Sequence, residues 1–158
     1  MSEPRVGLGF DVHGWGAGGT LHLAGVVVPD RAALLGHSDG DVVCHALADA
    51  LLGAAGLGDI GEHFPESDPA ISGIAGLDLL GEAVERVRAA GIEPISADVT
   101  VIAEQPSIAP IRSQMRANLS RAVGLAPERV SVKATRPEGL GLTGNGVGCL
   151  AIAVATVP

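Results

Sequence analysis

The chain has 158 residues, of which 47% are hydrophobic, 18% charged and 2% aromatic. This length suits one domain with a sizeable core, and this composition excludes a disordered chain and a coiled coil. The net charge of −8 argues against nucleic acid as a partner, because no basic surface is available to displace phosphate counterions. No apolar run is long enough to span a membrane and no targeting segment is recognisable, so we expect no membrane partner and a cytoplasmic protein of bacterial type.

The N-terminal part of the chain predicts two strands. Residues 6–12 alternate apolar side chains with small or polar ones, which is typical of a strand, and this strand delivers Asp11 and His13 at its end. Residues 21–28 predict a second strand, stopped by a Pro-Asp pair. The two strands could pair in antiparallel fashion.

A helix is expected from about residue 40 to residue 55, capped by Ser38 or Asp39. One face of this helix is apolar, and the opposite polar stripe consists of Asp41, His45 and Asp49. The following segment, residues 58–69, is turn-rich and acidic. A charged loop next to polar ligand-type residues is a candidate lid or substrate loop.

The rest of the chain alternates helices and strands. We expect a helix over residues 77–87, a strand over 95–103, a helix from Pro106–Ser107 to Gly124 and a strand over 130–135. A glycine-rich loop then leads to a near-continuous apolar strand over 149–157. Such a strand is buried on both faces, either inside the subunit or against a partner chain. The pattern predicts one α/β domain spanning residues 1–158.

Two histidines and an aspartate are candidate metal ligands. Asp11 and His13 are two residues apart, so both side chains leave the same face of an extended segment. His45 lies on the helix that follows. Two imidazoles and a carboxylate form the ligand set that zinc with an open coordination position prefers. In the alternative interpretation each histidine is a hydrogen-bonded member of a polar network, and the paired spacing favours the metal site.

Two later segments could bind an anionic ligand. In residues 132–148, Lys133, Thr135, Arg136 and Glu138 precede several glycines, and backbone N–H groups, hydroxyls and cations commonly bind phosphate oxygens. Magnesium could bridge Glu138 to such oxygens. The alternative is a glycine-rich hairpin with solvated charges, which composition alone favours. Residues 103–109 form a strand-to-helix turn whose free N–H groups could bind an anion or a base, although most such turns bind nothing.

Together these stretches closely resemble the 2-C-methyl-D-erythritol 2,4-cyclodiphosphate synthase family of the non-mevalonate isoprenoid pathway. The matching motifs are GFDVH (9–13), HSDGDVVCHAL (37–47), DALLGAAGLGDIGEHFPESDP (49–69), DVTVIAEQP (98–106) and VKAT…E…GLTG (132–144). They occur in order and at the family's spacing, and the resemblance spans essentially the whole chain.

The resemblance implies a fold, an assembly and an activity. The fold would be a single compact α/β domain of α+β type, with a mixed sheet covered by helices on one side. Three copies would form a homotrimer with active sites at the subunit interfaces. The enzyme would be a phosphorus–oxygen lyase that converts 4-diphosphocytidyl-2-C-methyl-D-erythritol 2-phosphate to the 2,4-cyclodiphosphate and CMP by metal-assisted intramolecular phosphoryl transfer.

The resemblance also implies residue roles. Asp11, His13 and His45 would hold Zn²⁺, and Glu138 with the substrate phosphates would hold Mg²⁺ or Mn²⁺. His37 and Arg136 would be catalytic, with His37 stabilising charge in the transition state. The implied substrate contacts are Asp11, Val12, His13, His37, Ser38, Asp59, Ile60, Gly61, Phe64, Pro65, Glu66, Ser67, Asp68, Ala103, Glu104, Gln105, Pro106, Ser107, Ile108, Ala109, Thr135, Arg136, Pro137, Glu138, Leu142 and Asn145.

Several residues depart from the family pattern, and two other functions stay open. These residues are Ser107, Arg136, Asn145 and Val147. One alternative is a zinc-dependent phosphohydrolase that activates water, with Asp41 or Asp49 as a base. The other is a trimeric nucleotide-binding module with weakened catalysis, which the departures at Arg136, Asn145 and Val147 keep open.

Overall fold

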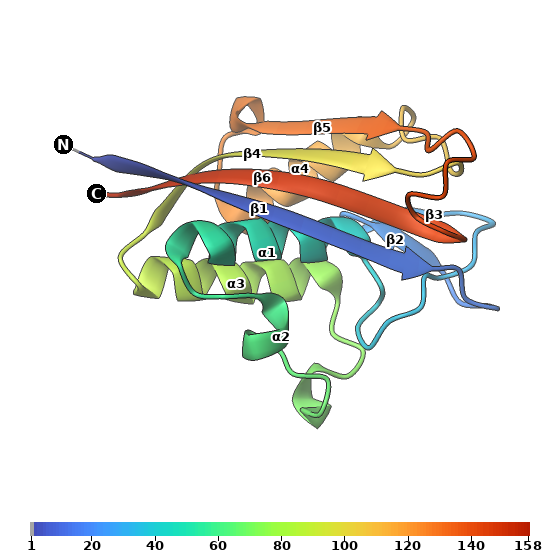
Figure 1. Ribbon diagram of the computed structural model, residues 1–158, viewed down its shortest axis with the longest axis horizontal. Coiled ribbons are helices and arrows are strands. Elements are labelled where there is room, and N and C mark those ends of the chain that lie inside the picture. The colour runs from blue at the N-terminus through green and yellow to red at the C-terminus, as the bar shows by residue number, and fades with distance from the viewer. Residues whose placement is uncertain (1) are drawn as a thin grey trace.

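Four strands form one mixed sheet in the computed structural model, which describes residues 2–158 (Figure 1). They are β1 (Glu3–Gly14), β4 (Glu93–Ile102), β5 (Val130–Thr135) and β6 (Gly146–Val157). The spatial order is β1-β6-β4-β5; β6 runs antiparallel to both of its neighbours, whereas β4 and β5 are parallel. The two ends of the chain lie side by side, because Glu3 pairs with Val157 (Figure 1).

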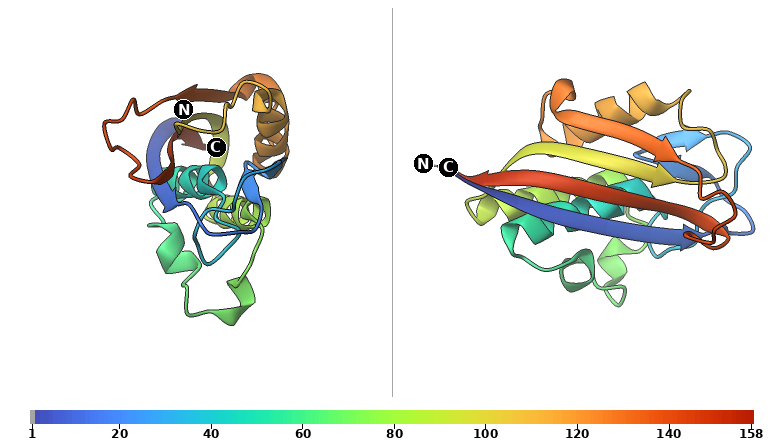
Figure 2. Two further views of the ribbon diagram at one scale, coloured as in Figure 1. Left: turned by 90° about the vertical axis from the view of Figure 1, so that its right-hand side faces the viewer. Right: turned by 45° about the horizontal axis from the view of Figure 1, so that its top comes forward.

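The long helices cover one face of this sheet. They are α1 (Val42–Ala55), α3 (Gly76–Ala89) and α4 (Arg112–Val123), and Figure 2 shows all three on the same side. The short elements are the turn of helix α2 (Ile60–His63) and the 3₁₀ turns η1 (Pro69–Ile71) and η2 (Pro127–Arg129). The predicted α+β architecture, a mixed sheet covered on one side, is confirmed. Within residues 2–158, no helix has both the length and the apolar character required to cross a bilayer.

Helix α1 packs directly on the backbone of β1. A Cβ atom at Gly7 would lie 1.8 Å from the Ala50 carbonyl oxygen, and one at Gly9 would lie 1.9 Å from that of Ala46. Only glycine on the strand permits this close approach, and the helix residues at the contact are alanines, whose side chains are small. The contact brings the N-terminal half of α1, including His45, next to the end of β1.

The predicted strand over residues 21–28 is instead a small hairpin. Its strands are β2 (Leu21–Leu23) and β3 (Val26–Val28), and they pair with each other rather than with β1. Ala24 and Gly25 turn the chain with left-handed backbone angles, φ 49° and 71°. The Asp41 carboxylate accepts both of their backbone N–H groups, at 2.9 and 2.7 Å. The predicted pairing with the first strand is therefore wrong, because this turn folds the segment onto itself.

Three other element boundaries differ from the sequence prediction. The N-cap of α1 is Asp41, which accepts the Cys44 N–H, rather than Ser38 or Asp39. Helix α4 begins at Arg112 instead of near residue 107, because Pro110 lacks an N–H and restricts the residue before it. Part of the segment predicted as an acidic loop, residues 58–69, folds as α2.

The final strand is buried on one face only. Gly146 to Cys149 are all buried, but from Cys149 to Thr156 buried residues alternate with more exposed ones, so the predicted burial of residues 149–157 on both faces inside the subunit is wrong. The exposed side chains continue those of β1 and form an open apolar face of the sheet: Val6, Leu8, Phe10, Val12, Leu150 and Ile152. Leu8 is 64% exposed and Ile152 42% exposed, so burial against a partner chain stays a prediction.

Candidate metal centre and its cavities

Three potential metal ligands meet where β1 ends beside α1. His13 Nε2 lies 2.8 Å from Asp11 Oδ2, His45 Nδ1 lies 3.2 Å from the same oxygen, and the two nitrogens are 3.3 Å apart. All three donor atoms lie within 4.8 Å of one another. Asp11 and His13 share a face of β1 because strand side chains alternate, and α1 supplies His45 from across the Gly9 contact. This cluster can hold a metal ion.

The charges of the cluster are strongly coupled. Burial alone would raise the pKa of Asp11, but hydrogen bonds and charge from His13 and His45 outweigh it and lower this pKa to about 2. The hydrogen bond that His13 donates to the Asp11 carboxylate raises the pKa of His13, although burial opposes the shift. Asp11 is therefore an anionic ligand throughout the neutral range, and His13 binds a proton more readily than a free imidazole does.

Two more residues from the loop before α1 adjoin the cluster. Ser38 Oγ lies 2.8 Å from His45 Nε2, on the side of the ring that faces away from Asp11. Such a partner orients a ligating imidazole and fixes its tautomer. His37 stands outside the three-residue cluster, with its Nδ1 3.7 Å from Glu66 Oε2. Both side chains of this pair are exposed, so His37 is accessible to a ligand.

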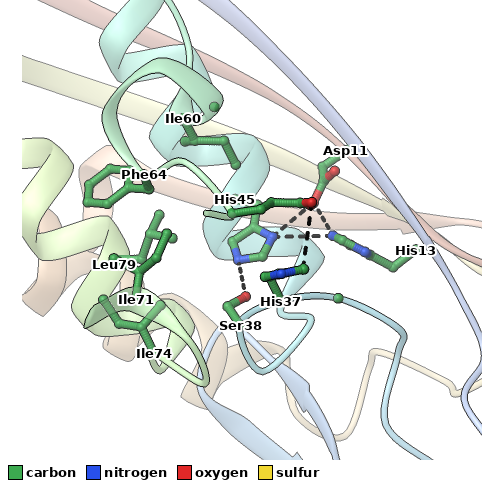
Figure 3. A pocket seen from close by; sticks show the side chains of 13 residues that line it. Asp11, His13, His37, Ser38, His45, Ile60, Phe64, Ile71, Ile74 and Leu79 are labelled. Atoms are coloured by element: carbon green, nitrogen blue, oxygen red, sulfur yellow. Dashed lines mark hydrogen bonds and ion pairs between the residues drawn. The ribbon is translucent and has the colours of Figure 1, made fainter. Parts of the chain in front are cut away.

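The cluster forms one side of a cavity of about 210 Å³. Polar side chains from β1, α1 and the loop before α1 face a group of apolar ones across it (Figure 3). Its lining residues are Asp11, His13, Gly36, His37, Ser38, His45, Ile60, Gly61, Phe64, Glu66, Ile71, Ile74 and Leu79. We call this the metal-side cavity. It can accept a ligand that is anionic at one end and partly apolar at the other.

A second cavity, of about 200 Å³, lies where β4 and β5 end and the chain turns toward α4. Its lining residues are Ala103, Pro106, Ser107, Ile108, Ala109, Arg112, Ala134, Thr135 and Arg136. We call this the turn-side cavity. Neither of its two arginines forms an ion pair or a side-chain hydrogen bond with another residue of the described chain, 2–158. A cavity with two unpaired guanidinium groups suits an anionic ligand.

The structure divides the expected substrate contacts into three groups. One group lines the metal-side cavity and another lines the turn-side cavity; of the described residues, none lines both. The third group lies outside both cavities: Val12, Asp59, Pro65, Ser67, Asp68, Glu104, Gln105, Pro137, Glu138, Leu142 and Asn145. Within that group, Glu104 accepts the N–H of Gly139 at 2.9 Å, which links the turn before α4 to the loop that carries Glu138.

Sequence reasoning missed several lining residues. In the metal-side cavity these are Gly36, Ile71, Ile74 and Leu79, and in the turn-side cavity Arg112 and Ala134. The three apolar side chains carry no chemical signal, and their spacing is also that of a helix packing against a core. Arg112 lies at the start of α4, just after the strand-to-helix turn. Its position in the sequence is the feature that could have indicated a place in the cavity wall.

Asp41 and Asp49 have structural partners. Asp41 is fully buried, its carboxylate accepts three backbone N–H groups, and burial raises its pKa. Asp49 is half-buried on α1, and its Oδ1 accepts the Ile60 N–H at 2.8 Å. Burial also raises the pKa of Asp49. Both carboxylates anchor the backbone around the metal-side cavity, and neither lines it.

Comparison with known proteins identifies the family. The model of the YgbB family matches residues 4–158. The chain belongs to the YgbB family. A 2-C-methyl-D-erythritol 2,4-cyclodiphosphate synthase from Symbiobacterium thermophilum is 49% identical to this YgbB-family chain, over 96% of the chain and 97% of that protein. A solved structure of a synthase of the same name, in a CDP-bound form, is 37% identical with a TM-score of 0.86, over 94% of this chain and 98% of its own.

The family also contains longer proteins. A bifunctional enzyme IspD/IspF from Chelativorans sp. (strain BNC1) is 53% identical over 99% of this chain, but this match covers 38% of that protein. The YgbB-family chain therefore spans less than half the length of this bifunctional relative.

Proposed function

We propose that this YgbB-family chain converts 4-diphosphocytidyl-2-C-methyl-D-erythritol 2-phosphate to 2-C-methyl-D-erythritol 2,4-cyclodiphosphate and CMP. Residues 1–158 act as one cyclodiphosphate synthase-like domain, and the reaction is that of a phosphorus–oxygen lyase. The observation that carries the proposal is the Asp11–His13–His45 cluster in the wall of the metal-side cavity. Synthase relatives about half identical over nearly their whole length support it.

Zinc is the proposed ion at the cluster, and the donor atoms fit it. Tetrahedral ligands at about 2.0–2.1 Å from zinc are separated by about 3.3 Å. Two of the donor separations in the structure, 3.2 and 3.3 Å, match that value, and the third, between His13 Nε2 and Asp11 Oδ2, is shorter at 2.8 Å. With Nε2–H of His45 donating to Ser38, the lone pair on Nδ1 is free to bind the ion. When bound, zinc supplies positive charge that stabilises phosphate oxygens.

The proposed chemistry needs no nucleophilic side chain. An oxygen of the substrate's own 2-phosphate forms a bond to the β-phosphorus, and the bond from that phosphorus to the oxygen of CMP breaks. The protein's part is to fold the substrate back on itself and to stabilise the charge between two phosphates. His37 and Ser38 line the metal-side cavity and are the proposed donors to the reacting phosphates.

Binding of the nucleotide end is proposed for the turn-side cavity. Residues 103–109 would hold the cytosine largely through backbone groups, while Thr135 and Arg136 contact the diphosphate. Glu138 would hold Mg²⁺ or Mn²⁺ together with phosphate oxygens. Its backbone adopts the left-handed conformation, φ 54°, which is uncommon outside glycine and often found where a side chain has a specific task.

We propose a homotrimer with interfacial active sites, which is supported by the finding that the two cavities share no lining residue. A substrate that reaches both residue sets would bridge the metal-side cavity of one subunit and the turn-side cavity of its neighbour. The open apolar face of β1 and β6 is the surface we propose to be buried in that assembly. Burying Leu8, Phe10 and Ile152 stabilises the trimer by roughly 25 cal/mol for each Å² of apolar surface removed from water.

The hydrolase alternative is less well supported than cyclisation. A metal-bound water needs a base nearby, and the two carboxylates suggested by the sequence both hold backbone N–H groups instead. The alternative of a nucleotide-binding module that has lost catalysis rests on Arg136, Asn145 and Val147. Arg136 and Asn145 are exposed and Val147 is buried, and these positions are compatible with either function.

One assay separates the three functions. The protein is incubated with the cytidyl substrate, Zn²⁺ and Mg²⁺, and the products are followed by phosphorus NMR. CMP together with a cyclic diphosphate is the expected result. Linear phosphates would instead indicate the hydrolase, and CDP binding without turnover would indicate the module; either outcome would reject the proposal.

A further inference from the structure

The wall of the metal-side cavity contains a segment too short to be stable by itself. Helix α2 is a single turn of four residues, and its Ile60 and Gly61 line the cavity together with Phe64, which follows directly. A helix of one turn in water is far below the length needed for stability. Its position must therefore come from contacts with the rest of the molecule.

Arg86 on α3 makes three contacts with the end of this segment. Its Nη1 donates to the His63 carbonyl oxygen at 3.1 Å and to His63 Nδ1 at 3.0 Å. Its guanidinium carbon lies 4.5 Å from the centre of the Phe64 ring. Glu82, one helical turn earlier, lies 3.9 Å from the guanidinium group and helps to orient it. One side chain thus contacts the backbone, an imidazole and an aromatic ring.

The imidazole of His63 links Arg86 to the segment that follows α1. Because arginine is always a donor, His63 Nδ1 must accept, and the ring proton is on Nε2. This Nε2–H donates to the Leu57 carbonyl oxygen, just after α1, at 2.7 Å. At the other end of α2, Asp49 accepts the Ile60 N–H. The turn is therefore fixed to α1 through Asp49, to the segment just after α1 through Leu57, and to α3 through Arg86.

We propose that Arg86 is a positioning residue for the metal-side cavity. It does not line the cavity, but it holds Phe64, which is 5% exposed and forms part of the apolar wall opposite the metal ligands (Figure 3). By fixing this wall, Arg86 sets how well the non-phosphate part of a substrate fits. The kinetic consequence rests on the proposed function; the structural consequence does not.

The kinetic test compares Arg86→Met with Arg88→Met. Arg88 is on the same helix, and it bonds the Val123 carbonyl and Glu93 on the side away from the cavity. In the cyclisation assay we expect Arg86→Met to raise KM about tenfold with little change in kcat, because a ring contact and two hydrogen bonds are lost. Arg88→Met should leave KM unchanged, and both variants should retain wild-type zinc content. Equal KM values for the two variants would overturn the proposal.

A second test does not depend on any activity. The sequence has two phenylalanines, Phe10 and Phe64, so labelling with 4-fluorophenylalanine gives two fluorine NMR lines, which Phe10→Tyr assigns. We expect the Phe64 line to shift or broaden in Arg86→Met and to stay at its wild-type position in Arg88→Met. An unchanged Phe64 line in Arg86→Met would refute the positioning role, even if the wild-type protein turned out not to cyclise its substrate.

Discussion

At the scale of single residues, the Asp11–His13–His45 cluster combines a local pattern with one long-range contact. Asp11 and His13 leave β1 on the same face because of the strand period, whereas His45 comes from α1. Ser38 completes the arrangement through the distal nitrogen of His45. Two ligands therefore depend on β1 and the third on α1, and each can be removed separately by substitution.

Replacing His45 with alanine should strongly weaken metal binding. His45 is 5% exposed, and the substitution removes one of three donors and leaves Ser38 without its partner. We expect zinc affinity to fall by more than about 100-fold and cyclisation to be lost. Competition with a chromogenic chelator measures the affinity, and His22→Ala, outside the cluster, is the control. Full zinc content in the His45 variant would rule out this assignment.

Metal affinity should depend on pH through His13. Zinc needs the neutral imidazole, and the hydrogen bond that His13 donates to the Asp11 carboxylate raises the pKa of His13 above 6.5. Affinity should therefore fall as the pH drops through this raised pKa, by up to about tenfold per pH unit. Chelator competition between pH 6 and 8.5 tests this slope, and a flat profile would contradict it.

The metal-free protein should show the opposite trend in stability. A raised pKa in the folded state means that the His13–Asp11 pair contributes its full stabilisation below pH 6.5, and that this contribution is lost as pH rises through the folded-state pKa. Urea unfolding of the chelator-treated protein over the same pH range measures the effect.

At the scale of elements, the metal-side cavity depends on how closely α1 approaches β1. The glycines of β1 and the alanines of α1 place two backbones in direct contact. Asp41 fixes the start of α1 to the β2–β3 hairpin, while Asp49 and Arg86 fix α2 on the other side. The cavity is thus held by backbone contacts and caps as much as by side-chain packing.

Gly9→Ala should disturb both stability and metal binding. The added methyl group would lie 1.9 Å from the Ala46 carbonyl oxygen, so α1 must move away from β1 and take His45 with it. We expect a loss of about 1–3 kcal/mol in the free energy of unfolding, with weaker zinc binding. Gly81→Ala is the matched control, because no atom lies within 4 Å of its new methyl group. That variant should gain about 0.5–1 kcal/mol in helix α3.

At the scale of the whole molecule, the sheet has one covered and one open face. The covered face carries the helices, whereas the open face presents apolar side chains of β1 and β6 to solvent. Large apolar patches of this kind mark interaction surfaces. In the proposed trimer this face is buried and the metal-side cavity of one subunit lies beside the turn-side cavity of its neighbour, which connects the proposed assembly to the proposed activity.

Leu8→Glu should therefore dissociate the assembly and abolish cyclisation together. A carboxylate on the open face would be buried without a partner in the trimer, a cost of several kcal/mol for each subunit. Analytical ultracentrifugation measures the mass, and Val27→Glu is the control, since Val27 is an exposed apolar residue on β3. A wild-type chain that sediments as a monomer yet cyclises its substrate would contradict the interfacial site.

Much of this protein could be predicted from local patterns in its sequence. Periods of 2 and 3.6 residues indicate β1, α1, α3 and β4, because burial of one face repeats along each element. The ligand set Asp11, His13 and His45 is visible as well, since its members are the residue types that zinc prefers. The predicted boundaries were wrong where only one or two residues determine them. The turn at Ala24–Gly25 divides the predicted second strand, and Pro110 delays the start of α4.

Only the tertiary structure decided which residues act together. Nothing local to His63 indicates Arg86, 23 positions away, and apolar residues such as Ile74 and Leu79 look the same in a core as in a cavity wall. The separation of the metal-side and turn-side cavities likewise depends on how α1 and α4 pack on the sheet. A sequence fixes residue chemistry and local periodicity, whereas distances between remote side chains arise only when the elements pack.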